Sequence, residues 1–172
     1  MVALPLDSAG TGDMFLMVKG ARTGVIKGEA QDDGHKNEID VLSWSWGMQA
    51  KVSLGGGTAT GKATVQELKI VKKIDSATTP LMSALRTNEQ IQKAVLTVRK
   101  AGKSQLEFFK ITIENGRVIS HSVTGGDEQG GHGVLERVSF SFNRIAVQYT
   151  PQGKDGSGLG AMEYTDQFDD AQ

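Results

Sequence analysis

The chain has 172 residues, no cysteine, and 19 lysines and arginines against 20 aspartates and glutamates. The lack of cysteine excludes thiol nucleophiles, disulfides and cysteine-ligated zinc. Without an excess of positive charge to neutralise phosphates, no nucleic-acid partner is expected. No apolar run is long enough for a signal peptide or a membrane-spanning helix, so no membrane insertion is expected. The length favours a single domain over residues 1–172.

Alternating residues predict a mainly β fold. A flexible leader, 1–12, precedes a first strand at 14–19. The next strand, 40–48 (DVLSWSWGM), holds both tryptophans, Trp44 and Trp46. Alternation places four large residues on one face of it: Leu42, Trp44, Trp46 and Met48. We expect this face to be buried, in the core or where the core continues into a subunit interface.

One segment, 76–88, predicts a short helix instead. Thr79 is the expected N-cap, and Pro80 occupies the first helical position, where its missing N–H costs nothing. The apolar residues on one face of this helix are Leu81, Met82 and Leu85.

The second half of the chain predicts further strands, at 95–100, 106–113 and 117–123. Asn115-Gly116 predicts a hairpin turn between the last two, because both turn positions favour positive φ. Apolar parity changes between Phe142 and Ile145, which predicts a bulge or bend near Asn143. The end, about 159–172, is expected to be an acidic tail, with 161–168 able to add an edge strand.

The glycine-rich stretch 56–63, GGTATGKA, fits a phosphate-binding loop except at its last position. Magnesium binding needs Ser or Thr there, and Ala63 has no hydroxyl group. A flexible loop between strands is the favoured interpretation. A nucleotide site at Gly56–Lys62 followed by a helix is the alternative.

Other polar groups suggest no site. Two clusters could supply metal ligands, Asp32, Asp33, His35, Glu38 and Asp40, and Asp127, Glu128 and His132. Their spacing matches no known ligand set, so we expect solvated loops and no metal or cofactor. His121 is interpreted as a surface or interface histidine. A charged face that pairs with acidic neighbours, and not a nucleic-acid groove, is expected from Lys69, Lys72, Lys73, Arg99, Lys100 and Lys103. We expect no catalytic residue.

Five strings occur in a characteristic order: 35–48 (HKNEIDVLSWSWGM), 61–85 (GKATVQELKIVKKIDSATTPLMSAL), 94–102 (AVLTVRKAG), 123–126 (VTGG) and 138–156 (VSFSFNRIAVQYTPQGKDG). They resemble the Hcp (haemolysin-coregulated protein) family, the inner-tube subunit of the bacterial type VI secretion system. The resemblance implies a compact antiparallel β-barrel with one short α-helix on its side, similar to phage tail-tube proteins.

The same resemblance implies hexameric rings that stack into a tube. A contractile sheath would drive the tube, a trimeric spike protein would sit at its tip, and small effectors would occupy its lumen. Assembly would take place in the bacterial cytoplasm, followed by secretion without a conventional signal peptide. A carrier or chaperone ring, with tube building secondary, is the alternative. Candidates for contacts between subunits or rings are Leu54, Gly55, Gly56, Gly57 and Thr58.

Overall fold

The computed structural model of the protein describes residues 13–52, 55, 61, 63–101, 105–126 and 133–168. Its elements, in chain order, are β1 (Met14–Gly20), β2 (Gly24–Val25), β3 (Ile39–Asp40), β4 (Ser43–Ser45), β5 (Met48–Gln49), β6 (Thr64–Val65), β7 (Leu68–Lys73), α1 (Thr78–Arg86), β8 (Gln90–Arg99), β9 (Glu107–Gly126), β10 (Gly133–Ser141), β11 (Arg144–Tyr149) and β12 (Met162–Gln167). The expected class, mainly β with one short helix, is confirmed. No helix of the described residues has the length and apolar character needed to cross a membrane.

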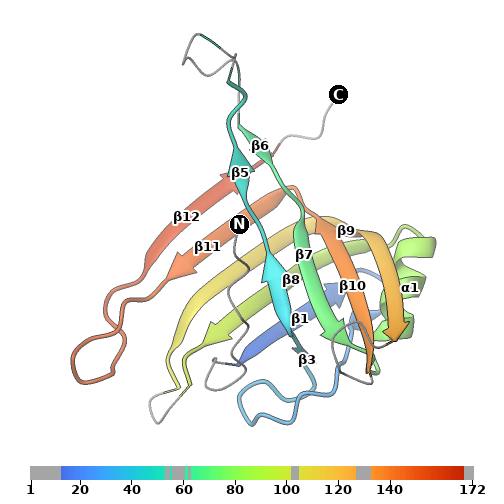
Figure 1. The fold of residues 1–172 in the computed structure, drawn as a ribbon, viewed down its shortest axis with the longest axis horizontal. Coiled ribbons are helices and arrows are strands. Elements are labelled where there is room, and N and C mark those ends of the chain that lie inside the picture. The colour runs from blue at the N-terminus through green and yellow to red at the C-terminus, as the bar shows by residue number, and fades with distance from the viewer. Residues whose placement is uncertain are drawn as a thin grey trace.

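Ten strands form one antiparallel sheet (Figure 1). Seven of them follow the order β2-β1-β8-β9-β10-β7-β4, and the other three, β3, β11 and β12, pair off this path. β9 is the central strand. Its first half pairs with β8 and β11, and its second half pairs with β10. β12 pairs with β11 and confirms the edge strand expected near the C-terminus.

The sheet curls but is not closed by a continuous strand ladder. Instead, residues 39–45 link its two ends, since β3 pairs with β1 and β4 pairs with β7. Between them, the Val41 N–H donates to the Met14 carbonyl and the Leu42 N–H to the Val71 carbonyl. Residues 39–45 therefore connect the two ends of the sheet, but the strand ladder itself does not close into the barrel that the family resemblance implied.

The hairpin expected at Asn115-Gly116 is wrong. β9 runs through both residues, which form a corner where the strand changes partners. Asn115 does have a positive φ of 52°. A Cβ on Gly116 would lie 1.8 Å from the Ser141 carbonyl oxygen. Asn115 and Gly116 thus allow a positive φ and a close contact between backbones within one strand. A hairpin turn needs the same two properties.

The bend expected near Asn143 is confirmed, because β10 ends at Ser141 and β11 begins at Arg144. The change of parity brings apolar residues of both strands to the inner face, since Phe140 and Ile145 are both fully buried. Each strand therefore presents its own apolar face to the same core.

Helix α1 begins one residue before the expected cap, at Thr78, and its N-cap is Ala77. Asp75 supplies the side-chain hydrogen bond at the start of the helix, because its carboxylate accepts from the Ala77 N–H at 2.9 Å. The Thr78 hydroxyl in turn accepts from the Asp75 N–H at 3.0 Å. Leu81 is buried as expected, whereas Met82 is 46% exposed and does not share its face.

Candidate assembly surface

The tryptophan segment is a short strand, β4, followed by an irregular turn toward β5. Trp44 faces inward opposite Ile70, and its ring stacks on Phe109 at 5.6 Å between centroids. Trp46 also packs against the core, and its buried Nε1 has no hydrogen-bond partner in the described part of the chain. In the single chain Leu42 and Met48 are 41% and 48% exposed, so neither lies in its core, and a subunit interface is the expected place of burial that remains for them. Pairing of β4 with β7 stops at Ser45, so the alternation does not continue as one flat strand.

Trp44 belongs to a larger apolar surface, which we call the aromatic face. Phe109 lies opposite Tyr149 across the β9–β11 ladder, and Tyr149 lies opposite Met162 across β11–β12. The Tyr164 hydroxyl contacts the Met48 sulfur at 3.7 Å. The aromatic face consists of Trp44, Trp46, Met48, Phe109, Val147, Tyr149, Met162 and Tyr164.

The aromatic face continues the inner face of the sheet from the core to positions that are exposed to solvent. Along β11, Ile145 is fully buried, Val147 is half-buried and Tyr149 is 45% exposed. Met162 on the neighbouring strand is 63% exposed. A row that starts in the core and ends uncovered is the pattern of a surface that another chain covers.

The aromatic face also reaches an open sheet edge. β12 pairs with β11 and with no other described strand. In Figure 1, β11 and β12 extend to the left, away from α1. The Tyr164 hydroxyl donates to Asp166 at 3.0 Å, and this bond raises the pKa of Tyr164. An unpaired strand edge favours association with a further strand or chain.

Of the interface candidates from the sequence, only Gly55 belongs to the described residues. Leu54, Gly56, Gly57 and Thr58 fall outside the described residues, and Gly55 has a positive φ of 102°. The two strands that lead toward this loop, β5 and β6, pair with each other and project from the main sheet (Figure 1). The chain after Gly56–Lys62 forms β6 and β7, not the helix that a phosphate-binding loop requires.

The opposite, outer face of the sheet is polar. Register places five serines on it, and these line a depression of about 440 Å³ together with Lys69 and Arg137. None of their hydroxyls is hydrogen-bonded to the described part of the chain. The serines are Ser43, Ser45, Ser120, Ser122 and Ser139.

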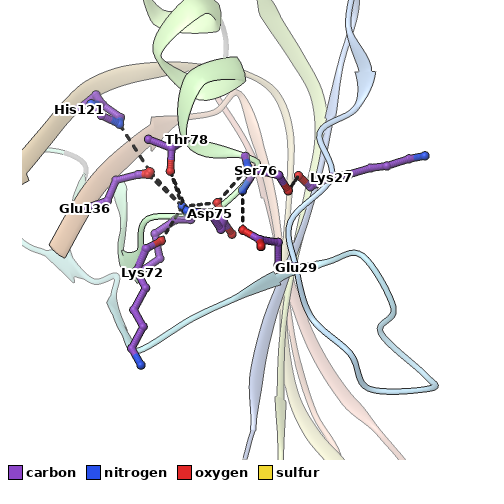
Figure 2. Close-up of polar contacts among 10 residues, drawn as sticks. Lys27, Glu29, Lys72, Asp75, Ser76, Thr78, His121 and Glu136 are labelled. Carbon is purple, nitrogen blue, oxygen red and sulfur yellow. Dashed lines mark hydrogen bonds and ion pairs between the residues drawn. The ribbon is translucent and has the colours of Figure 1, made fainter. Parts of the chain in front are cut away.

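A buried charge cluster lies on the inner face, where α1 meets the sheet. Lys72 donates to Glu136 at 2.9 Å, to Asp75 at 2.7 Å and to the Lys73 carbonyl at 3.0 Å. Figure 2 shows these groups converging on the Lys72 amine. The cluster ties β7 and β10 to the start of α1. The Ser76 N–H extends it to Glu29 at 2.8 Å.

The sequence predicted a charged face that pairs with acidic neighbours, and the pairing is confirmed for two of its members. Lys72 pairs with Glu136 and Asp75, and Arg99 pairs with Asp32. The sequence did not predict that both side chains are buried, at 0% and 6% exposed. His121 is also not at the surface. Its side chain is 6% exposed, and Nε2 lies 3.6 Å from Glu136 (Figure 2). Strand parity could have revealed Lys72, since it follows Leu68 and Ile70 at every second position.

The two acidic clusters have different outcomes. Asp32 pairs with Arg99, and His35 contacts Glu38 and Glu107. Asp127, Glu128 and His132 lie outside the described residues. Over the ranges that the structure covers, no three histidine, aspartate or glutamate side chains gather as a metal-binding group.

Comparisons with known proteins agree with this architecture. Residues 15–149 match the family described as "Type VI secretion system effector, Hcp". Protein hcp1 of Pseudomonas aeruginosa is 40% identical over 151 residues, covering 86% of this chain and 89% of the relative.

Solved structures of Hcp proteins share the fold, and two of them illustrate the similarity. Hcp1 from Salmonella typhimurium has a TM-score of 0.72 at 31% identity, with 92% of this chain and 95% of that chain covered. A type VI secretion system effector from Yersinia pestis has a TM-score of 0.70 at 26% identity, with 90% and 99% covered. The resemblance stated from the sequence is thus confirmed. The chain belongs to the Hcp family of type VI secretion system proteins.

Proposed function

We propose that this protein is a structural subunit of the type VI secretion tube. Copies form hexameric rings in the bacterial cytoplasm. The rings stack, and a contractile sheath drives the tube and its trimeric spike protein toward a target cell. The observation that carries this proposal is the aromatic face, which continues the core of one subunit to an open sheet edge.

Ring closure follows from the kind of contact such an edge makes. The exposed Met162 and Tyr164 lie on β12, which branches from the main path of the sheet through β11, whereas the two ends of that path are β2 and β4. A contact between unlike surfaces of neighbouring copies is head-to-tail, and it forms a closed ring when the rotation between copies closes. Burial of the aromatic face would stabilise each contact by about 25 cal/mol per Å² of apolar area removed from water.

The test compares two matched substitutions of exposed methionine. Met162→Lys should abolish ring formation, because a charge would be buried in the contact, while Met82→Lys on α1 should leave rings intact. Size-exclusion chromatography with light scattering and negative-stain imaging measure both. Rings that persist in Met162→Lys, or a wild type that stays monomeric at high concentration, would exclude the aromatic face as the contact.

The polar depression on the outer face supports a second role, carriage of small effectors. Five serine hydroxyls without intramolecular partners can hydrogen-bond a polar cargo surface without holding it by apolar burial. In this proposal the serine-lined face is turned toward the ring lumen. Ser122→Trp should preserve rings but lower the amount of small proteins co-secreted with the tube. Unchanged co-secretion in Ser122→Trp would contradict the carrier role, and tube building would then be the one proposed function.

A further inference from the structure

Two of the three exposed methionines in the described part of the chain belong to the aromatic face. They are Met48 on β5 and Met162 on β12, and the third is Met82 on α1. Met14 and Met17 on β1 are less exposed. Thioether groups are therefore concentrated on the surface that the proposed ring contact covers, and Met82 is a methionine of similar exposure at another place on the molecule.

The side chains of Met48 and Met162 both lie beside Tyr164. Met162 precedes Tyr164 by two residues on β12, so the two side chains project from the same face of the strand. Met162 also lies opposite Tyr149 in the β11–β12 ladder. The Met48 sulfur lies 3.7 Å from the Tyr164 hydroxyl. The exposed part of the aromatic face thus consists of two thioethers and two phenol rings.

The thioethers are the sites of sulfur oxidation in this protein, because its sequence has no cysteine. A sulfur lone pair attacks one oxygen of hydrogen peroxide, and a sulfur–oxygen bond forms as the oxygen–oxygen bond breaks. The leaving hydroxide takes the proton of the transferred oxygen and departs as water. The sulfur is oxidised by two electrons, and the peroxide is reduced by two. The product, methionine sulfoxide, is polar where the thioether was apolar.

A sulfoxide would change the aromatic face in two ways. In a subunit contact its oxygen would be removed from water, and a buried acceptor without a donor is destabilising. At Met48 the new oxygen would lie next to the Tyr164 hydroxyl, which now donates to Asp166 at 3.0 Å. Because a hydroxyl has one proton to donate, the sulfoxide and Asp166 would compete for it. Both changes weaken the aromatic face as an apolar contact.

We propose that Met48 and Met162 form an oxidation site at which peroxide blocks the association of free subunits. This inference rests on the proposed ring contact through the aromatic face. A free subunit exposes both side chains, whereas the ring contact covers them. Oxidation therefore acts on subunits before assembly and has little effect on rings that have already formed.

Protection of the two methionines in the ring is the first test. Wild-type rings are treated with hydrogen peroxide, and sulfoxide at each methionine is followed over time by peptide mass spectrometry. Met48 and Met162 should oxidise at least about fivefold more slowly than Met82, because oxidation follows exposure. Equal rates for Met162 and Met82 in rings would overturn the inference.

The second test sorts chains by their ability to assemble. Wild-type protein, diluted until its subunits are free, is oxidised in part, freed of peroxide, concentrated and separated into rings and free subunits by size-exclusion chromatography. Sulfoxide at Met48 and Met162 should be at least about fivefold more abundant in the free subunits than in the rings. Sulfoxide at Met82 should be equally abundant in both fractions. Equal abundance of Met162 sulfoxide in the two fractions would overturn the inference.

Matched variants connect the effect to the two sulfurs, and each variant is compared with its own untreated sample. In the double variant Met48→Leu, Met162→Leu, which keeps apolar side chains of similar volume, peroxide should no longer lower the yield of rings. Met82→Leu should stay as sensitive to peroxide as wild type. A double variant as sensitive as wild type would also overturn the inference.

The untreated wild type separates this inference from the proposed function. If the untreated protein forms no rings, the ring proposal fails, and the oxidation site fails with it. If the untreated protein forms rings and these rings contain Met162 sulfoxide as often as the free subunits do after treatment, the oxidation site alone is refuted.

Discussion

Lys72 and Glu136 stand directly opposite each other in the β7–β10 ladder and form an ion pair in which neither side chain is exposed. Nζ lies 2.9 Å from both carboxylate oxygens. The Lys72 ammonium also donates to Asp75 and to the Lys73 carbonyl, so all three of its N–H groups are hydrogen-bonded. The pair thus joins two strands of the sheet to the turn that starts α1.

Removal of one partner should be much more costly than removal of both. Lys72→Met leaves Glu136 buried without its counter-ion, and we expect a loss of about 3–5 kcal/mol in the free energy of unfolding. The double variant Lys72→Met, Glu136→Leu should recover most of that loss, because no charge remains buried. Urea unfolding at a fixed protein concentration measures both.

The control for this pair is Lys69→Met on the same strand. Lys69 is exposed and lies 4.0 Å from Glu67, so the change should stay within about 0.5 kcal/mol. A Lys72→Met variant as stable as Lys69→Met would contradict a structural role for the buried pair.

Local pattern predicted most elements of this fold but not how they pair. Alternation located β1, β8 and β11, the apolar character of 161–168 located β12, and a change of parity located the bend after Ser141. Asn115-Gly116 shows where such reasoning fails. These residue types indicate a positive φ and a close approach of two backbones. Both a hairpin and a corner within β9 have this local geometry. Which one forms depends on β10 and β11, which arrive later in the chain.

The assembly surface was also predictable only in part, because local pattern does not give strand register. Two tryptophans in an alternating strand indicated a wide apolar face, and Trp44 does pack inward on Phe109. The members from β11 and β12 could not be foreseen, because Tyr149 and Met162 join the face only through strand register. The burial of Lys72 was not predicted, because the residue was assigned to a charged face, although its parity with Leu68 and Ile70 places it on the inner face.

Gly116→Ala tests the corner in β9. The new Cβ would overlap the Ser141 carbonyl oxygen, and backbone atoms of two strands would have to separate. Overpacking of this kind costs about 1–3 kcal/mol. Gly133→Ala in β10 is the control, since nothing lies within 4 Å of its added Cβ. Thermal unfolding of the two variants should differ by several degrees. Equal melting temperatures would mean that the corner relaxes without cost.

Glu89 should give the protein an acid-sensitive contact between β8 and the β1–β2 turn. The residue is 6% exposed, and its carboxylate accepts from the Thr23 hydroxyl at 2.8 Å, the Thr23 N–H at 3.0 Å and the Arg22 guanidinium at 3.1 Å. Burial alone would raise the pKa of Glu89, but these hydrogen bonds outweigh it and hold the pKa below its ordinary value.

A lowered pKa means that the folded state binds fewer protons than the unfolded state near the ordinary pKa of glutamate, about 4.3. The stabilisation is therefore complete above that pH and is lost as pH falls through the pKa of Glu89 in the folded protein. Glu89→Gln should lower the free energy of unfolding by about 1–3 kcal/mol at pH 7. The difference from wild type should shrink below about pH 4. Asp33→Asn, at an exposed loop position, should parallel wild type throughout. Urea unfolding from pH 7 to pH 3 measures all three curves, and a Glu89→Gln deficit that stays constant with pH would show that the carboxylate charge is not its cause.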